Sequence, residues 1–216
     1  MNRPQSAGKP ADRDTGATVF VVDDDDAVRD SLCMLLESVG LRYRSYPSAA
    51  EFLLAYKPDH AGCLVLDIRM PGMSGIELQE RLNEIGAILP VIFITGHGDV
   101  PLAVKAMRAG AVDFLQKPYN EQELLDRIHR ALQGDGDRRR ELLERDLIVR
   151  RHGKLTPRER EVFDLIVQGK PNKVVASDLG VSQRTVEIHR SRVMEKMEAT
   201  SFAHLMNMAM LLQEGS

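Results

Sequence analysis

The sequence lacks any apolar run long enough to cross a bilayer, and it has only two cysteines among 216 residues. The first absence excludes a membrane-spanning helix. Cys33 and Cys63 lie in apolar stretches, which indicates small buried residues in a reducing compartment rather than a disulfide framework. The N-terminal residues are polar and lack the apolar core of a signal peptide. We therefore expect a cytoplasmic protein that makes no contact with membranes.

Several common functional signatures are also missing. The six histidines are scattered without the spacing of metal ligands, and there is neither a glycine-rich phosphate-binding loop nor an internal repeat. The charge, in contrast, is informative. From Arg150 onward the chain carries 11 Lys/Arg and 8 Asp/Glu, whereas the residues before it carry 18 and 24. An acidic first part favours a metal or phosphate site, and a basic last part favours binding to a polyanion.

The first half of the chain alternates strand and helix signals. Apolar runs predict strands at 18–22, 41–46, 63–66, 91–94 and 112–115. Amphipathic segments predict five helices. The first spans 27–39, the second begins at Ser48, the third ends near residue 84, the fourth begins at Asp99 and the fifth spans 120–132. Strands that are apolar throughout are typical of a parallel sheet covered on both faces. Five such repeats fit an α/β doubly wound, flavodoxin-like sheet with strand order 2-1-3-4-5.

The pattern divides the chain into four parts. We expect a disordered tail at 1–17, the α/β domain at 18–133, a helical linker at 134–153 and an all-α helix-turn-helix domain at 154–216. The glycines of Gly134-Asp135-Gly136 predict a break after the last helix of the α/β domain. The segment beyond them has an apolar stripe that is too short for a coiled coil, so a linker is favoured over a pairing helix.

Polar side chains follow four of the predicted strands. Asp23 and Asp24 follow the first strand, Asp67 the third, Thr95 the fourth and Lys117 the fifth. Because ligands bind beyond the carboxyl ends of parallel strands, one pocket should hold three carboxylates, a hydroxyl and an ammonium. That set suits a hard divalent cation and a phosphoryl group, with one carboxylate free to act as a nucleophile.

The motifs around these residues resemble those of two-component receiver domains of the CheY type. The resemblance covers residues 18–133 and is carried by Val21-Val22-Asp23-Asp24, Leu64-Val65-Leu66-Asp67-Ile68-Arg69-Met70-Pro71, Ile94-Thr95-Gly96 and Gln116-Lys117-Pro118. It implies that Asp67 attacks the phosphorus of a phosphohistidine on a sensor histidine kinase and becomes an acyl phosphate.

The resemblance also implies a role for each neighbour of Asp67. Mg²⁺ would be held by Asp24, Asp67, the backbone carbonyl of Arg69 and waters, with Asp23 beside it. Lys117 would pair with a phosphoryl oxygen, and the hydroxyl of Thr95 would bind another oxygen only in the phosphorylated state. The Lys117-Pro118 bond is expected to be cis.

A narrower match involves the segments Ile94-Thr95-Gly96-His97-Gly98-Asp99-Val100-Pro101, Ala111-Val112-Asp113-Phe114 and Lys117-Pro118, which are similar to the FixJ subgroup of LuxR-type regulators. In that subgroup, phosphorylation dimerises the receiver through its fourth helix and fifth strand. The corresponding candidates here are Val100, Pro101, Val104, Lys105, Arg108 and Phe114. The alternative is an ordinary solvated helix face. Phe114 also matches the position of the switch aromatic, with plain core packing as the alternative.

The last part of the chain predicts four helices at 156–168, 172–178, 182–197 and 201–212, with a turn at Gly180 and a cap at Ser182. It is similar to LuxR-type DNA-binding domains from Leu155 through Met210. The residues that carry this match are Leu155-Thr156-Pro157-Arg158-Glu159-Arg160-Glu161-Val162, Asn172-Lys173, Val181 to Arg190 and Val193-Met194-Glu195-Lys196-Met197. A four-helix protein-interaction module is the alternative.

The third of these helices has two distinct faces. At ~100° per residue, Val186, Val193 and Met197 share the buried face. The opposite face carries Arg184, Ile188, Ser191, Arg192 and Glu195, with Glu187 on its flank. An exposed Ile188 suits contact with a thymine methyl, and Glu187 could accept a hydrogen bond from a cytosine amino group. The resemblance implies phosphate contacts by Lys173, Gln183, Thr185, His189 and Lys196.

The combined expectation is a two-component response regulator rather than an enzyme. Phosphorylation of Asp67 would form a homodimer that binds double-stranded promoter DNA and acts with RNA polymerase to activate transcription. One alternative is a phosphorylation-independent DNA-binding regulator with a vestigial receiver. The other is a phosphatase similar to the haloacid dehalogenases, in which Asp23 would be the nucleophile.

Overall fold

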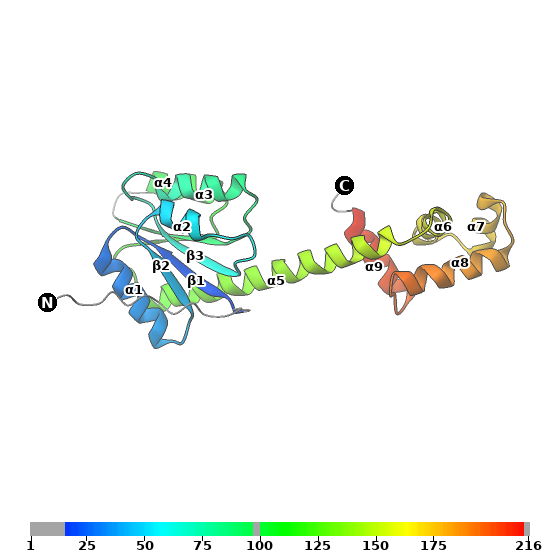
Figure 1. The fold of residues 1–216 in the computed structure, drawn as a ribbon, viewed down its shortest axis with the longest axis horizontal. Coiled ribbons are helices and arrows are strands. Elements are labelled where there is room, and N and C mark those ends of the chain that lie inside the picture. Colours follow the sequence, from blue (N-terminus) through cyan, green and yellow to red (C-terminus); the bar gives the residue numbers. More distant parts are fainter. Residues whose placement is uncertain (1–15, 97–99, 214–216) are drawn as a thin grey trace. The chain divides into compact units, whose positions relative to one another are not determined.

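The computed structural model describes residues 16–96 and 100–213, without the side chains of residues 100, 101 and 103. The expected tail therefore lies almost wholly outside the described residues, as does the expected helix start at Asp99. The chain forms two compact units (Figure 1). The boundary between them falls between Arg138 and Arg139. Within the described ranges, no helix combines the length and the apolar character needed to cross a membrane.

A five-stranded parallel sheet forms the centre of the first unit. Its strands are β1 (Thr18–Val22), β2 (Tyr43–Tyr46), β3 (Gly62–Asp67), β4 (Val91–Thr95) and β5 (Asp113–Gln116). Their order in the sheet is β2-β1-β3-β4-β5. This order and the parallel pairing confirm the predicted flavodoxin-like fold. The boundaries of β1 agree with the predicted ones, and those of the other strands differ from them by at most two residues.

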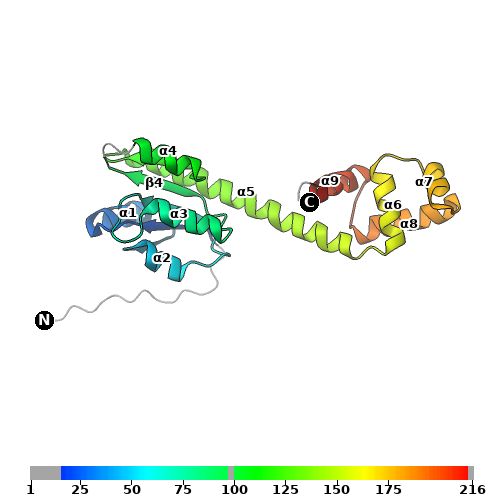
Figure 2. The same ribbon diagram turned by 90° about the horizontal axis from the view of Figure 1, so that it is seen from above.

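Helices cover both faces of the sheet because its strands are apolar on both sides (Figures 1 and 2). The helices are α1 (Asp26–Ser38), α2 (Ala49–Ala55), α3 (Gly75–Glu84), α4 (Val100–Arg108) and α5 (Glu121–Gly153). Along β1, Val19 and Val21 pack into the core under α1 and α5, whereas Phe20 and Val22 pack under α2, α3 and α4. This alternation follows from the two-residue repeat of a strand.

The predicted break at Gly134-Asp135-Gly136 is wrong, because α5 continues through it to Gly153. Each glycine inside a helix costs about 1 kcal/mol relative to alanine, so another interaction must favour the helix here. Asp135 is buried, and its Oδ2 accepts a hydrogen bond of 2.8 Å from the backbone N–H of Gly62 at the start of β3. This hydrogen bond connects α5 to β3 at the position where the sequence indicates a break.

The second unit consists of the last part of α5 and four further helices. These helices are α6 (Pro157–Val167), α7 (Asn172–Leu179), α8 (Gln183–Lys196) and α9 (Phe202–Gln213). They pack around one apolar core that includes Val162, Val186 and Val193, with Ile148 contributed by α5. Gly180 ends α7 in the left-handed conformation at φ 64°, which an amino acid with a side chain adopts at a cost. The predicted helix-turn-helix is therefore present.

Candidate functional site

The carboxyl edge of the sheet in the first unit gathers the predicted pocket. Asp67 ends β3, Thr95 ends β4, Asp23 directly follows β1 and Lys117 directly follows β5. Asp23, Asp67 and Thr95 are buried, although charged and polar groups are normally exposed. The fold thus brings together three side chains whose chemistry would be costly to bury without a partner.

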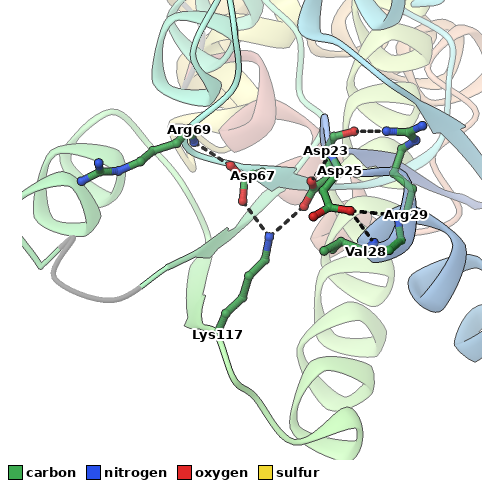
Figure 3. A network of polar contacts seen from close by, with 8 residues as sticks. Asp23, Asp25, Val28, Arg29, Asp67, Arg69 and Lys117 are labelled. Carbon is green, nitrogen blue, oxygen red and sulfur yellow. Dashed lines mark hydrogen bonds and ion pairs between the residues drawn. The ribbon is translucent and has the colours of Figure 1, made fainter.

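Lys117 joins the two buried carboxylates (Figure 3). Its Nζ lies 2.8 Å from Oδ1 of Asp67 and 2.9 Å from Oδ2 of Asp23. The second oxygen of Asp67 accepts a hydrogen bond of 2.6 Å from the backbone N–H of Arg69. The Lys117–Pro118 bond is cis, as expected. Both oxygens of Asp67 are therefore held in place, and its carboxylate has a fixed direction.

The electrostatics of the pocket balance burial against this ion pair. Burial raises the pKa of the Asp67 carboxyl, and Asp23 acts in the same direction, while the hydrogen bond and charge of Lys117 oppose the shift. Burial also disfavours the charged form of Lys117, but its contacts with Asp67 and Asp23 outweigh that effect and raise its pKa. Lys117 is thus a firmly protonated cation beside a carboxylate that lacks full hydration.

Asp23 is also held by two contacts that sequence reasoning did not identify. Its Oδ1 accepts a hydrogen bond of 2.9 Å from the N–H of Asp25, and its backbone oxygen accepts one of 2.7 Å from Nη1 of Arg29. Asp25 itself caps α1 by accepting hydrogen bonds from the N–H groups of Ala27 and Val28. The sequence indicates an acidic cap, but no local pattern points to the contact made by Arg29.

The oxygen ligands predicted for Mg²⁺ are only partly assembled. Asp23 and Asp67 lie together on Lys117, whereas Asp24 is exposed. Within residues 16–96 and 100–213, no three acidic, histidine or cysteine side chains are placed so that they could hold a metal ion. The chemistry of the donors nevertheless fits, because two buried carboxylate groups and a nearby exposed one supply the hard oxygen atoms that Mg²⁺ prefers.

The helix-turn-helix of the second unit places the predicted faces as expected. Val186, Val193 and Met197 are buried, and the exposed face of α8 carries Arg184, Glu187, Ile188 and Arg192. Ser182 caps α8 by accepting a hydrogen bond of 3.1 Å from the N–H of Thr185. Of the predicted phosphate contacts, Lys173 and Gln183 are exposed, while Thr185, His189 and Lys196 are half-buried.

Two comparisons with protein families match the two units separately. The response regulator receiver domain matches residues 19–129, and the luxR family of bacterial regulatory proteins matches residues 153–209. Because the receiver match covers more than half of the chain and includes the Asp67 pocket, it decides the family. The chain belongs to the two-component response regulators.

Relatives extend this assignment over most of the response regulator. The transcriptional regulatory protein FixJ of Azorhizobium caulinodans is 49% identical over 89% of this chain and 92% of its own length. Nodulation protein W of Bradyrhizobium diazoefficiens is 45% identical over 94% of this chain and 89% of its own. Among solved structures, the response regulator StyR matches with a TM-score of 0.81 and 46% identity over 89% of this chain and 98% of its own. The response regulator is therefore a FixJ-like transcription regulator.

The predicted dimer face of the response regulator is exposed and partly apolar. Val104 and Arg108 on α4 are exposed, and Lys105 forms a loose ion pair of 3.6 Å with Glu80. The side chains of Val100 and Pro101 lie outside the described residues. Phe114 is 37% exposed, so its alternative as an ordinary core residue is wrong. Two further apolar side chains on these segments, Met107 and Val112, are exposed and were missed by the sequence analysis.

Lys196, a predicted phosphate contact, forms an ion pair within the domain that the sequence analysis did not predict. Its Nζ lies 2.6 Å from Oε2 of Glu159, a buried carboxylate that also accepts a hydrogen bond of 2.8 Å from the N–H of Thr156. The hydrogen bond from Lys196 is the main reason that the pKa of Glu159 is lowered to about 2, and the Thr156 amide adds to it. A DNA phosphate would have to compete with Glu159 for this ammonium.

The lowered pKa of Glu159 predicts how the stability of the LuxR-type domain depends on pH. Since Glu159 ionises near pH 2 in the folded state and at 4.5 ordinarily, its stabilisation is complete above about pH 5 and disappears as the pH falls toward 2. We expect Glu159→Gln to lower the free energy of unfolding by about 2 kcal/mol at pH 7 and by less at pH 3 to 4. Urea unfolding followed through the NMR methyl signals of Val186 and Val193 measures this difference.

The matched control is Glu161→Gln on the same helix. Glu161 is half exposed and pairs with Arg158, so its loss should cost no more than about 0.5 kcal/mol at either pH. An equal loss for both variants, or a loss at Glu159 that does not change with pH, would contradict the role of this buried ion pair.

Proposed function

We propose that a partner histidine kinase phosphorylates Asp67 and that the phosphorylated receiver dimerises and binds promoter DNA to activate transcription with RNA polymerase. The observation that supports this most directly is the state of the Asp67 carboxylate. It is buried at the carboxyl edge of the sheet, with Lys117 on one oxygen and the N–H of Arg69 on the other. A carboxylate held in this way is positioned to react with a group that enters from the open edge.

The proposed reaction is a phosphoryl transfer. An oxygen of Asp67 forms a bond to phosphorus, the P–N bond of the kinase phosphohistidine breaks, and the imidazole leaves with the electron pair and takes up a proton. The ammonium of Lys117 compensates the charge of the incoming group and keeps the acceptor oriented. Burial helps further, because a poorly hydrated carboxylate loses little solvation when it reacts.

The transferred phosphoryl group needs more positive charge than Lys117 alone carries. Mg²⁺, when bound, supplies it and draws charge from the phosphoryl oxygens. We assign its coordination to Asp24, Asp67 and the backbone carbonyl of Arg69, with Asp23 beside it. The exposed side chain of Asp24 must turn toward Asp67 for this, and its position on a surface loop leaves it room to do so.

The switch is proposed to run from Thr95 to the dimer face. The hydroxyl of Thr95 binds a phosphoryl oxygen once Asp67 is modified, which gives the modified state a contact that the resting state lacks. β4 and β5 are paired, and Thr95 lies opposite Gln116, two residues beyond Phe114. A shift at Thr95 can therefore reach Phe114 through one strand pair and change the face formed by Val104, Lys105, Arg108 and Phe114.

On DNA, the exposed face of α8 is proposed to enter the major groove. Arg184, Glu187, Ile188 and Arg192 then read base edges, while Lys173, Gln183, Thr185, His189 and Lys196 contact phosphates. One such unit covers a single half-site, so a dimer is needed to bind a paired site. This links the phosphorylation of Asp67 to promoter affinity.

The test of this proposal is the identity of the phosphorylated side chain. The response regulator is incubated with acetyl phosphate and Mg²⁺, reduced with borohydride so that an acyl phosphate becomes homoserine, and mapped by mass spectrometry. We expect homoserine at Asp67. Homoserine at Asp23 would instead support the phosphatase alternative. No modified aspartate would favour a vestigial receiver.

A further inference from the structure

The receiver domain contains a cavity far from the chemistry of Asp67. Its volume is about 490 Å³, and it lies where β4 and β5 begin, at Val91 and Asp113. Thr95 and Lys117 mark the opposite ends of these strands, so the cavity and the phosphorylation pocket occupy opposite edges of the sheet. Pockets that hold small ligands usually measure about 300–1,000 Å³, which includes this volume.

The wall of the cavity is apolar on one side and cationic on the other. The apolar side chains come from α3, from the loop before β4, from the first residue of β4 and from the residue before β5, and they include Leu82, Ala87, Ile88, Leu89, Val91 and Val112. The cationic side is formed by Arg127, Arg130 and Arg138 of α5. An apolar wall beside guanidinium groups favours a ligand that has an apolar body and an anionic end.

Two of the three guanidinium groups are available to such a ligand. Arg127 is engaged with Asp113 and Glu123. Arg130 is 72% exposed, and its Nη2 lies 4.0 Å from Asp113, which is the limit of an ion pair. Only its Nε is engaged, in a hydrogen bond of 3.3 Å to the backbone oxygen of Asp126. Arg138 is exposed, and it makes no hydrogen bond or ion pair with the residues that the structure describes. The carboxylates on the cavity wall are occupied in part, because Asp113 binds Arg127 and Asp135 binds the N–H of Gly62.

Two buried polar atoms on the wall have no hydrogen-bond partner among the described residues. Gln79 is only 1% exposed, and its Oε1 has no hydrogen-bond partner among the described residues. The Nε atom of Arg127 is also buried and has no hydrogen-bond partner among these residues. Buried polar atoms without partners are rare in folded proteins and require an explanation. Both residues line the same cavity. The N–H at Nε of Arg127 can donate to a ligand carboxylate, whereas Oε1 of Gln79 is an acceptor and requires a donor such as water.

We propose that this cavity binds a small amphipathic carboxylate. The apolar body packs against Leu82, Leu89 and Val91, and the carboxylate faces Arg130 and Arg138. This site does not depend on phosphorylation of Asp67. A bound carboxylate would nevertheless affect the dimer face, because it competes with Asp113 for Arg130. Asp113 in turn accepts a hydrogen bond of 2.9 Å from the N–H of Phe114. The response regulator would thus have a second ligand-binding site, beside residues 127–138 of α5.

NMR titration of the full chain tests the ligand chemistry with three probes. Cyclohexanecarboxylate should cause saturable shifts of backbone amides at 79–91 and 127–138, with a Kd on the order of 1 mM for a ligand of this size. Its neutral carboxamide and inorganic phosphate should each bind at least ~10-fold more weakly, because one lacks the charge and the other the apolar body. Equal binding of either control, or no saturable shift with the carboxylate, overturns the proposal.

Two pairs of variants test the location. A Cβ at Gly134 meets no atom within 4 Å, so Gly134→Leu has room for its first side-chain carbon at the cavity wall, is expected to occupy part of the cavity, and favours the helix. Gly136→Leu is its control, because Gly136 offers the same space and does not line the cavity. Arg130→Gln is compared with Arg150→Gln, which is also 72% exposed on α5.

Gly134→Leu and Arg130→Gln are expected to weaken carboxylate binding at least ~5-fold, and the two controls to leave it unchanged. Wild-type affinity in Gly134→Leu places the ligand elsewhere and refutes the site. Wild-type affinity in Arg130→Gln refutes the proposed anion contact. The free energy of unfolding of each variant shows that a lost affinity does not come from a lost fold.

Discussion

Acetyl phosphate and Mg²⁺ are expected to convert the wild-type response regulator into a dimer that binds a paired promoter site at least about 100-fold more tightly, whereas Asp67→Asn stays monomeric. Asparagine has the shape of aspartate but lacks the anionic oxygen that attacks phosphorus. The substitution should not unfold the receiver, because Lys117 keeps its 2.9 Å contact with Asp23. Mass measurement in solution and titration of a promoter fragment, with and without the phosphodonor, give both quantities.

Asp30→Asn serves as the control for this experiment. Asp30 is an exposed aspartate on α1, outside the pocket, so its loss should leave dimerisation and DNA binding at the wild-type level. If Asp67→Asn dimerises and binds DNA as the wild type does, phosphorylation of Asp67 is not the switch. If both proteins bind tightly without a phosphodonor, the receiver is vestigial in this chain, and the DNA-binding domain acts independently of it.

The pocket around Asp67 was predictable because its information is local in the sequence. Each of its residues directly follows a short apolar run, and parallel strands align their carboxyl ends at one edge. The exposed face of α8 follows from a similarly local pattern, whereas the order of the strands followed from the fit of five β-α repeats to the flavodoxin-like fold. Spacing alone does not predict that Lys117 contacts both Asp23 and Asp67, because a lysine at this position could also face the pocket without touching either carboxylate.

Two features that the sequence did not predict depend on contacts between distant residues. The continuity of α5 depends on a hydrogen bond between Asp135 and Gly62, which lie 73 positions apart. The internal role of Lys196 depends on Glu159, 37 positions away. Glycine content describes only neighbouring residues, so it indicated a break in the first case, and in the second the phosphate contact of Lys196 was implied by resemblance alone. Such contacts require the folded structure.

The exposed face of α8 leads to the other prediction with a large expected effect. Arg184 lies in the first turn of α8, is exposed and forms no hydrogen bond or ion pair with the described part of the chain. The N-terminal residues of a recognition helix are those that reach base edges in the major groove. A bidentate arginine–guanine contact contributes about 1–3 kcal/mol, and a dimer makes it twice. We expect Arg184→Ala to reduce the affinity of the phosphorylated dimer by about 4 kcal/mol, roughly 1,000-fold.

Lys173→Ala provides the contrast that separates base reading from phosphate binding. Lys173 is exposed on α7, where a phosphate contact adds affinity without sequence preference. Its loss should weaken specific and non-specific DNA alike, and it should reduce the slope of log K against log salt by about 2 for the dimer. Arg184→Ala should instead act mainly on the specific site and relax the preference at one base pair of each half-site.

Arg81→Ala is the control for the removal of a positive charge, since Arg81 is an exposed arginine of the receiver and pairs with Glu84. Binding isotherms for the promoter fragment and for a scrambled fragment, at several salt concentrations, distinguish the three variants. An equal loss of affinity for both fragments in Arg184→Ala would place this arginine on the phosphate backbone. Specificity would then have to come from Glu187, Ile188 and Arg192, the remaining side chains of the face that α8 exposes.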